Sequence, residues 1–235
     1  MAMKPISFWR RLLDLISPRM CVVCGHRLTV SEEYFCTKCN FHLPRTNFHK
    51  NPYENMMAKL FWAQIPIERA TGFYFYEPHA ETARIIYQLK YEDQPEIGEV
   101  MGRMMAKEIK GLGFFDGIDG IVPVPLAKGR QHQRGYNQSM EIAKGVSEVT
   151  GLPIYDKVVK RIYFKSSQTN LGRWARQENV EKVFELIDGA KIHGKHLLVI
   201  DDVVTTGATI IACSKELVKA GDVKVSVLSL GFAKS

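Results

Sequence analysis

Four of the five cysteines form two Cys-x-x-Cys pairs near the N-terminus. The pairs are Cys21/Cys24 and Cys36/Cys39, with 11 residues between them. Each pair can direct two thiolates at one ion, so together they offer the four ligands of a closed, tetrahedral Zn²⁺ site. A disulfide pair, a redox-active dithiol or an iron ion would use the same residues, but an odd total of five cysteines, with four of them clustered, does not fit a secreted disulfide framework. The spacing therefore favours a structural zinc.

The second chemical motif joins two acids to a hydroxyl-rich turn. Asp201 and Asp202 follow an apolar run, and the turn and helix start behind them contain Thr205, Thr206, Gly207, Ala208 and Thr209. Backbone N–H groups at a helix N-terminus favour a bound phosphate, and the carboxylates can accept hydrogen bonds from vicinal hydroxyls or meet Mg²⁺. The motif predicts a sugar-phosphate site. The alternative is an ordinary helix N-cap with two exposed acids; no Walker loop occurs in the sequence.

The elements that must position these motifs alternate between strands and helices. The patterns predict strands over residues 72–76, 118–125, 158–163, 196–200 and 224–230, and helices over 80–89, 97–109, 138–149 and 208–219. The continuous apolar run 196–200 is typical of a central parallel strand, and the strand–helix–strand order after it implies a right-handed parallel unit. In such α/β sheets ligands bind at the carboxyl ends of the strands. The predicted fold class is α/β.

Composition limits the alternatives. The chain has 235 residues, 46% of them hydrophobic, and a net charge of +7, so it has enough apolar content for a folded core. No apolar run reaches the roughly 18 residues that cross a bilayer, and charges interrupt the N-terminal apolar stretch where a signal peptide needs continuity. We expect a cytoplasmic protein without a membrane span. The polar, turn-like stretch near residue 50 suggests a segment 1–60 with the cysteine ribbon and a larger domain 61–235.

Basic residues are concentrated in two places. Residues 1–60 contain nine Lys and Arg against four Asp and Glu, and residues 128–176 contain ten against three. The second group suggests a wall that binds anions, although a solvated loop would have the same composition. The first group lies among aromatic residues, which would suit single-stranded DNA through stacking and phosphate contacts; the alternative is that they fill the core of the ribbon. These aromatic residues are Phe8, Trp9, Tyr34, Phe35, Phe41 and Phe48.

Residues 201–209 resemble the motif with which type I phosphoribosyltransferases bind 5-phosphoribosyl-1-pyrophosphate (PRPP), and the wider pattern resembles the ComF family, which is associated with competence and DNA uptake. The likeness covers nearly the whole chain. It includes the cysteine ribbon, Tyr87–Tyr91, Val122–Pro125, Arg134–Gln138 and the polar stretch 168–179. It implies a mostly parallel phosphoribosyltransferase-like sheet flanked by helices and preceded by a small zinc ribbon.

The resemblance also implies roles for individual residues. Asp201 and Asp202 would bind the ribose hydroxyls of PRPP, residues 205–209 its 5-phosphate, and Lys90 with Tyr91 would lie at the pyrophosphate loop. Arg134, Arg173 and Arg176 would neutralise the anion, the last two from a mobile loop, with Mg²⁺ accompanying PRPP. Ordinary surface arginines, and a helix-end cation at Lys90, are the alternatives.

The implied reaction is transfer of phosphoribosyl from PRPP to an acceptor that the sequence does not identify, with release of pyrophosphate, as in glycosyltransferases. It needs no protein nucleophile, and Cys213 is expected to be a buried apolar residue in a helix. A glutaminase activity is not expected, because the N-terminal cysteines are the presumed zinc ligands. Whether the chain catalyses at all stays open: the alternative is a non-catalytic ComF-type protein that binds DNA or a DNA-uptake helicase. A homodimer is also left open.

Overall fold

The structure is a computed structural model that describes residues 17–127, 129, 134–162 and 183–233. Its α-helices are α2 (Thr37–His42), α3 (Met56–Lys59), α4 (Ala83–Tyr91), α5 (Pro95–Ile109), α7 (Gln138–Thr150) and α9 (Ala208–Leu217). Short 3₁₀ helices are η1 (Phe48–Lys50), η2 (Lys110–Leu112) and η3 (Val218–Ala220). The strands are β1 (Ile67–Phe75), β2 (Gly120–Pro123), β3 (Val159–Arg161), β4 (Phe184–Leu186), β5 (His196–Val204) and β6 (Lys224–Phe232).

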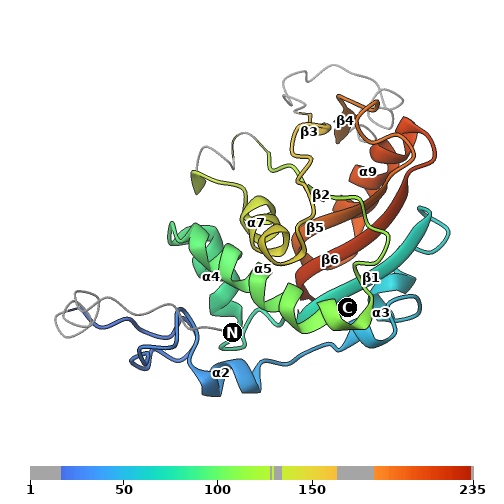
Figure 1. Ribbon diagram of the computed structural model, residues 1–235. Helices are drawn as coiled ribbons and strands as arrows, with labels where there is room; N and C mark the ends of the chain where they lie inside the picture. The colour runs from blue at the N-terminus through green and yellow to red at the C-terminus, as the bar shows by residue number, and fades with distance from the viewer. Residues whose placement is uncertain (1–16, 128, 130–133, 163–182, 234–235) are drawn as a thin grey trace, which may run out of the picture.

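Four strands form a parallel sheet in the order β1-β6-β5-β2. β3 and β4 pair separately as an antiparallel ribbon (Figure 1). The predicted α/β class is therefore confirmed, and so is the parallel β5–α9–β6 unit. Because all four strands of the sheet run the same way, their carboxyl ends meet at one edge, where the loops after β2 and β5 become neighbours.

Both faces of the sheet are covered, as the apolar run of β5 predicts. Leu198 and Ile200 belong to the hydrophobic cluster that includes α4, α5 and α7, whereas Leu197 and Val199 belong to the cluster on α3 and α9. Alternate residues of one strand therefore face opposite layers, which is the period of two that a strand imposes. Figure 1 shows α4, α5 and α7 on one side of the sheet and α9 on the other.

Several strand boundaries differ from the predicted ones; β1, for example, begins at Ile67 and not at residue 72. β5 does not end at Ile200 but continues through both aspartates, because its pairing with β6 extends to Val204 opposite Phe232. The short strand β4 has no counterpart among the predicted elements, because three residues are too few for a recognisable alternation. The acids of the predicted sugar site are therefore part of a hydrogen-bonded strand, which fixes their backbone.

The cysteine-containing segment packs against the α/β layer. Its buried side chains Val22, Phe35 and Leu43 belong to the same cluster as the core of α4 and α5. The Arg84 guanidinium of α4 donates to the carbonyl oxygen of Val23 over 2.9 Å. The division at residues 60/61 stays a prediction. None of the helices within the described ranges combines the length and apolar content needed to cross a bilayer.

Candidate functional site

A cavity of about 150 Å³ opens at the carboxyl edge of the sheet, between β2, β5, α4 and α7. Five of the predicted site residues line it: Lys90, Arg134, Asp201, Asp202 and Thr209. They come from four parts of the chain and meet because β2 and β5 are parallel neighbours. The cavity combines carboxylates, cations and a helix start, which together suit a ligand with both hydroxyl groups and anionic groups.

The two aspartates have different partners. The Lys90 ammonium forms an ion pair with Asp202 (Nζ to Oδ2, 2.8 Å), and both side chains are largely buried. Asp201 Oδ1 accepts hydrogen bonds from the Ser139 hydroxyl at 3.0 Å and from the Asp202 backbone N–H at 2.9 Å. Burial, followed by the neighbouring charge of Asp202, raises the pKa of Asp201 to about 7. Asp201 therefore changes its charge near neutral pH.

Residues 134–139 organise the wall opposite the aspartates. The Arg134 guanidinium lies over the ring of Tyr91, with Cζ 5.2 Å from the centroid, and donates to Gln138 Oε1 at 3.1 Å. Gly135 has a φ of +73°, a conformation that L side chains rarely adopt. This turn returns the chain to the first residue of α7, so that Arg134 and Gln138 face the same cavity.

The next two residues of this segment attach it to the fold. The Tyr136 hydroxyl donates to the Leu89 carbonyl oxygen at 2.7 Å, near the end of α4. The Asn137 side chain accepts from the Ser139 N–H at 3.1 Å as the N-cap of α7 and donates to the Val124 carbonyl oxygen at 3.0 Å. The segment thus fixes the positions of α4, β2 and α7 relative to one another.

The turn after β5 begins α9 without a capping side chain at its N-cap. Gly207 is the N-cap residue with a φ of +77°, and its side of the turn lies against Phe61. In the first turn of α9 the Ala208 N–H has only a long contact, 3.4 Å, to the Thr206 hydroxyl. Backbone donors at the start of α9 are therefore available to an anion.

Several predicted residues do not line the cavity. The chain between Val203 and Thr209 contains four of them: Thr205, Thr206, Gly207 and Ala208. Val203 and Thr209 line the cavity, but these four residues do not. Tyr91 is exposed and does not line the cavity itself, but its ring contacts the guanidinium of Arg134, which does. Arg173 and Arg176 lie outside the described residues.

Four polar residues that line the cavity were not among the predicted site residues: Asn137, Gln138, Ser139 and Arg161. Gln138 and Ser139 look like ordinary polar residues of a helix start, and the signal that could have singled them out is Asn137. As an N-cap at the sheet edge, it places the next two residues at the site. Arg161 is the last residue of β3, with Cζ 5.3 Å from the Phe184 ring centroid. Nothing in its local pattern separates it from other charged strand ends.

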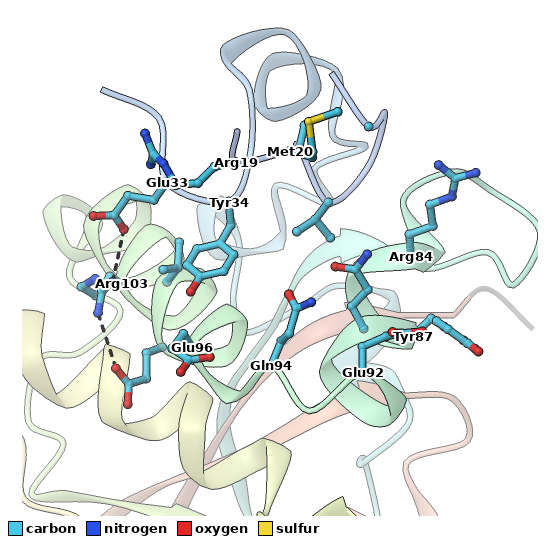
Figure 2. Close-up of a pocket in the computed structure, with 16 residues that line it drawn as sticks. Arg19, Met20, Glu33, Tyr34, Arg84, Tyr87, Glu92, Gln94, Glu96 and Arg103 are labelled. Carbon is cyan, nitrogen blue, oxygen red and sulfur yellow. Dashed lines mark hydrogen bonds and ion pairs between the residues drawn. The ribbon is translucent and has the colours of Figure 1, made fainter. Parts of the chain in front are cut away.

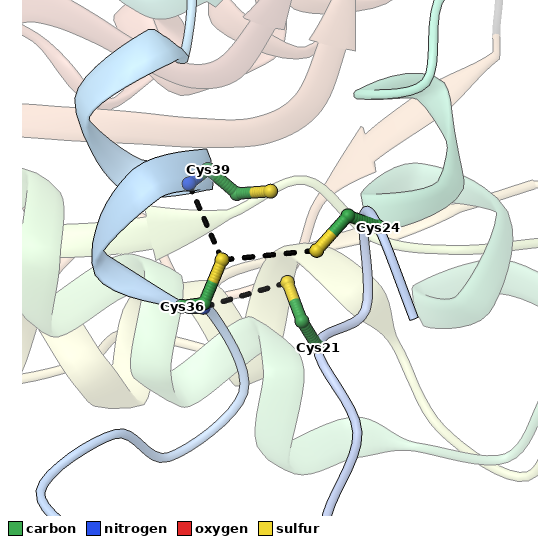
Figure 3. Close-up of side chains that lie close together, drawn as sticks. All are labelled: Cys21, Cys24, Cys36 and Cys39. Carbon is green, nitrogen blue, oxygen red and sulfur yellow. Dashed lines mark hydrogen bonds between the residues drawn. The ribbon is translucent and has the colours of Figure 1, made fainter. Parts of the chain in front are cut away.

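The four predicted metal ligands are brought together (Figure 3). Their four Sγ atoms all lie within 4.8 Å of one another, and none of the four is in a disulfide: Cys21, Cys24, Cys36 and Cys39. The Sγ atoms of Cys24 and Cys36 are 3.7 Å apart. Zn–S bonds of about 2.3 Å place sulfurs ~3.8 Å apart in a tetrahedron, so the cluster fits zinc and could bind it.

A second cleft, of about 810 Å³, lies between the cysteine segment and helices α4 and α5 (Figure 2). Its arginines have protein partners. Arg103 Nη1 lies 3.1 Å from a Glu148 carboxylate oxygen, and Nη2 lies 3.5 Å from Glu33. Arg19 donates to the Glu32 carbonyl oxygen at 2.6 Å. The Arg103 contacts join the cysteine segment to α5 and α7, whereas the Arg19 contact lies within that segment. Of the predicted site residues that the structure describes, only Cys21 lines this cleft.

The aromatic residues of the N-terminal segment divide into two groups. Phe35 is buried, and Tyr34 and Phe48 pack against the two hydrophobic clusters, so these three follow the core alternative. Phe41 on α2 is 84% exposed and contacts only the edge of the His42 ring among the aromatic pairs described. Phe8 and Trp9 lie outside the described residues.

Known proteins with similar sequences include proteins named for DNA utilization and for competence. The chain is 29% identical to DNA utilization protein YhgH of Escherichia coli over 214 residues, which cover 90% of this chain and 89% of that protein. It is 29% identical to competence protein F of Haemophilus influenzae over 63% of this chain and 67% of that protein. It is 30% identical to competence protein ComFC of Streptococcus pneumoniae over 60% and 59%. No protein-family model matches the chain.

Two solved structures with some likeness are of phosphoribosyl enzymes. A glutamine PRPP amidotransferase from B. subtilis is 19% identical with a TM-score of 0.41, and the match covers 60% of this chain and 30% of that one. An adenine phosphoribosyltransferase from Leishmania tarentolae is 11% identical with a TM-score of 0.36 over 77% and 89% of the two chains.

Proposed function

Because this chain is related to competence proteins of the ComF type, we propose that its sheet-edge cavity binds PRPP and supports transfer of the phosphoribosyl group to an acceptor. The observation that carries the proposal is the gathering of Lys90, Arg134, Asp201, Asp202 and Thr209 in one cavity. The ligand that this combination suits is a sugar with a free diol, a terminal phosphate and a second anionic group.

Each part of PRPP has a group of residues that suits it. The carboxylates of Asp201 and Asp202 would accept hydrogen bonds from the ribose hydroxyls, while the turn 205–209 and the start of α9 would donate to the 5-phosphate. Lys90 and Arg134 would neutralise the pyrophosphate, with Tyr91 supporting Arg134. Mg²⁺ would accompany the pyrophosphate, and Arg173 and Arg176 would add positive charge.

In the proposed reaction the bond between C1 of ribose and the pyrophosphate oxygen breaks as the acceptor attacks C1. Charge moves onto the leaving pyrophosphate, so cations fixed in the cavity stabilise the transition state more than the ground state. The fixed strand end and helix start orient C1 toward the acceptor. The protein supplies position and charge and forms no covalent intermediate.

Calorimetric titration with Mg²⁺ and PRPP tests the binding step. Asp202→Asn keeps the shape of the side chain but removes the charge that pairs with Lys90, so we expect affinity to fall about tenfold or more. Asp222→Asn removes an exposed carboxylate from the loop before β6 and should stay within about twofold of wild type. A wild-type chain that binds no PRPP, or an Asp202→Asn variant with unchanged affinity, would overturn the assignment.

The acceptor is best sought by screening nucleobases and amines for PRPP-dependent release of pyrophosphate. An acceptor that raises the release rate in wild type but not in Asp202→Asn would identify the transfer reaction. If PRPP binds and no acceptor promotes release, the cavity serves binding alone.

A second function is favoured by Phe41, whose exposure is unusual for an aromatic side chain, together with the basic N-terminal segment. We propose that this segment contacts single-stranded DNA. Stacking on an aromatic side chain contributes ~1–3 kcal/mol per base, so Phe41→Ala should weaken binding about fivefold or more, and affinity should fall steeply with salt. Trp62→Ala, which changes an exposed aromatic residue outside segment 1–60, is the matched control. Absent or salt-independent binding would contradict this function.

The zinc site completes the proposal. Zn²⁺ held by Cys21, Cys24, Cys36 and Cys39 would be structural, because four protein thiolates leave no open coordination position. A homodimer stays a prediction.

A further inference from the structure

Gln138 is an almost fully buried polar residue in the wall of the cavity. It is 1% exposed and is the first residue of α7. Arg134 donates to its Oε1 over 3.1 Å. A guanidinium has only donors, so the amide oxygen must face Arg134 and the amide nitrogen must face elsewhere. The orientation of the amide is therefore fixed by its neighbour.

The Gln138 amide nitrogen has no hydrogen-bond partner among the described residues. A buried donor left unpaired costs ~1–3 kcal/mol, which makes it an unusual feature of a well-packed helix start. Gln138 also lines the cavity. The donor is thus placed where a ligand acceptor could satisfy it.

The N-terminus of α7 also favours a ligand that accepts hydrogen bonds at this wall of the cavity. The helix has 13 residues, and the lining residues Asn137, Gln138 and Ser139 form its N-cap and first turn. The positive end of its dipole and the Arg134 guanidinium therefore lie on the same wall as the unpaired amide. Asp201 and Asp202 also line the cavity and would repel an anion. Asp201 already accepts from Ser139 in the first turn of α7, so an anionic group fits best at the Arg134 and Gln138 side of this wall.

We propose that the Gln138 amide donates a hydrogen bond to an oxygen of the pyrophosphate group of PRPP, next to Arg134. Gln138 is then a specificity-determining binding residue that distinguishes a pyrophosphorylated sugar from the sugar monophosphate. The inference rests on the proposed function and extends it, since it names the part of the ligand that the α7 wall recognises.

The test compares three probes: PRPP, inorganic pyrophosphate and ribose 5-phosphate, each titrated with Mg²⁺ into the full chain. Gln138→Met keeps the length of the side chain but removes both the amide donor and the acceptor of Arg134, whereas Gln138→Glu keeps an acceptor for Arg134 and lacks the donor. We expect Gln138→Met to weaken PRPP and pyrophosphate about tenfold and to leave ribose 5-phosphate within about twofold of wild type. Gln138→Glu, which presents a carboxylate to the anion, should weaken them further. Gln64→Met, an exposed glutamine, is the matched control.

The other outcomes of this test contradict the inference in distinguishable ways. Unchanged affinities in Gln138→Met, or a loss confined to ribose 5-phosphate, overturn the inference while PRPP binding stands. Equal losses for all three probes show a structural role and also overturn it. A wild-type chain that binds no PRPP ends the proposed function together with this extension. If the variants do not fold, the ¹⁵N side-chain amide signal of Gln138 in wild type decides: it must shift with pyrophosphate and not with ribose 5-phosphate.

Discussion

Asp201 is the residue whose chemistry depends most on its surroundings. As a free side chain it would be ionised at neutral pH, but burial and the charge of Asp202 raise its pKa to about 7. Its hydrogen bonds from Ser139 and from the Asp202 N–H act in the opposite direction, because they favour the ionised form. The result is a carboxyl group that is about half ionised at pH 7.

This predicts a pH dependence of PRPP affinity. The ribose hydroxyls need an ionised acceptor, so affinity should rise as pH increases through about 7, and the ionised fraction grows roughly tenfold between pH 6 and pH 8. Calorimetry across that range with wild type and Asp201→Asn checks it. The phosphates of the ligand also titrate in this range. The prediction therefore concerns the difference in PRPP affinity between wild type and Asp201→Asn at each pH. Parallel pH profiles would contradict the prediction.

The turn between β5 and α9 shows how an element boundary creates a binding feature. β5 continues through Asp201 and Asp202 to Val204, so the chain has only residues 205–207 in which to turn into α9. That short turn requires the positive φ at Gly207 and brings its backbone close to Phe61, since a Cβ there would lie 2.9 Å from the ring. The tight turn directs the first N–H groups of α9 toward the sheet edge.

We therefore expect Gly207→Ala to destabilise the fold. A non-glycine residue in the left-handed region costs ~1–2 kcal/mol, and displacement of Phe61 adds to it. The measurement is the free energy of unfolding in urea. Gly111→Ala is the control, because a Cβ there meets no atom within 4 Å and the backbone has no positive φ. Equal stabilities of the two variants would argue against a strained turn.

Over the whole molecule, the cysteine cluster and the α/β layer share one hydrophobic core. Cys21 itself is buried in the cluster that contains α4 and α5, and contacts such as Arg103 with Glu33 cross between the two parts. A short segment with few aliphatic residues gains much of its stability from its metal. Loss of zinc should therefore also lower the stability of the α/β layer.

The expected metal content is one zinc per chain in protein purified without chelator. Cys36→Ser should lose the metal and lower the melting temperature by about 5 °C or more, the shift that ~2 kcal/mol causes in a chain of this size. Cys213→Ser is the control, because Cys213 is a buried residue of α9 outside the cysteine cluster and should leave the zinc in place. Zinc retained by Cys36→Ser, or absent from wild type, would refute a four-thiolate site.

Local sequence determined the features that depend on neighbouring residues: the two Cys-x-x-Cys turns, the apolar run of β5, the turn into α9 and most helices. These follow from short-range periodicity and from residues whose chemistry is evident in their spacing. Only the tertiary structure decided that Lys90 pairs with Asp202, that Ser139 reaches Asp201, and that the buried Gln138 amide nitrogen has no partner among the described residues. Those contacts join residues far apart in the chain, and they exist because the parallel order of the sheet places β2 beside β5 and brings α4 and α7 to the same edge.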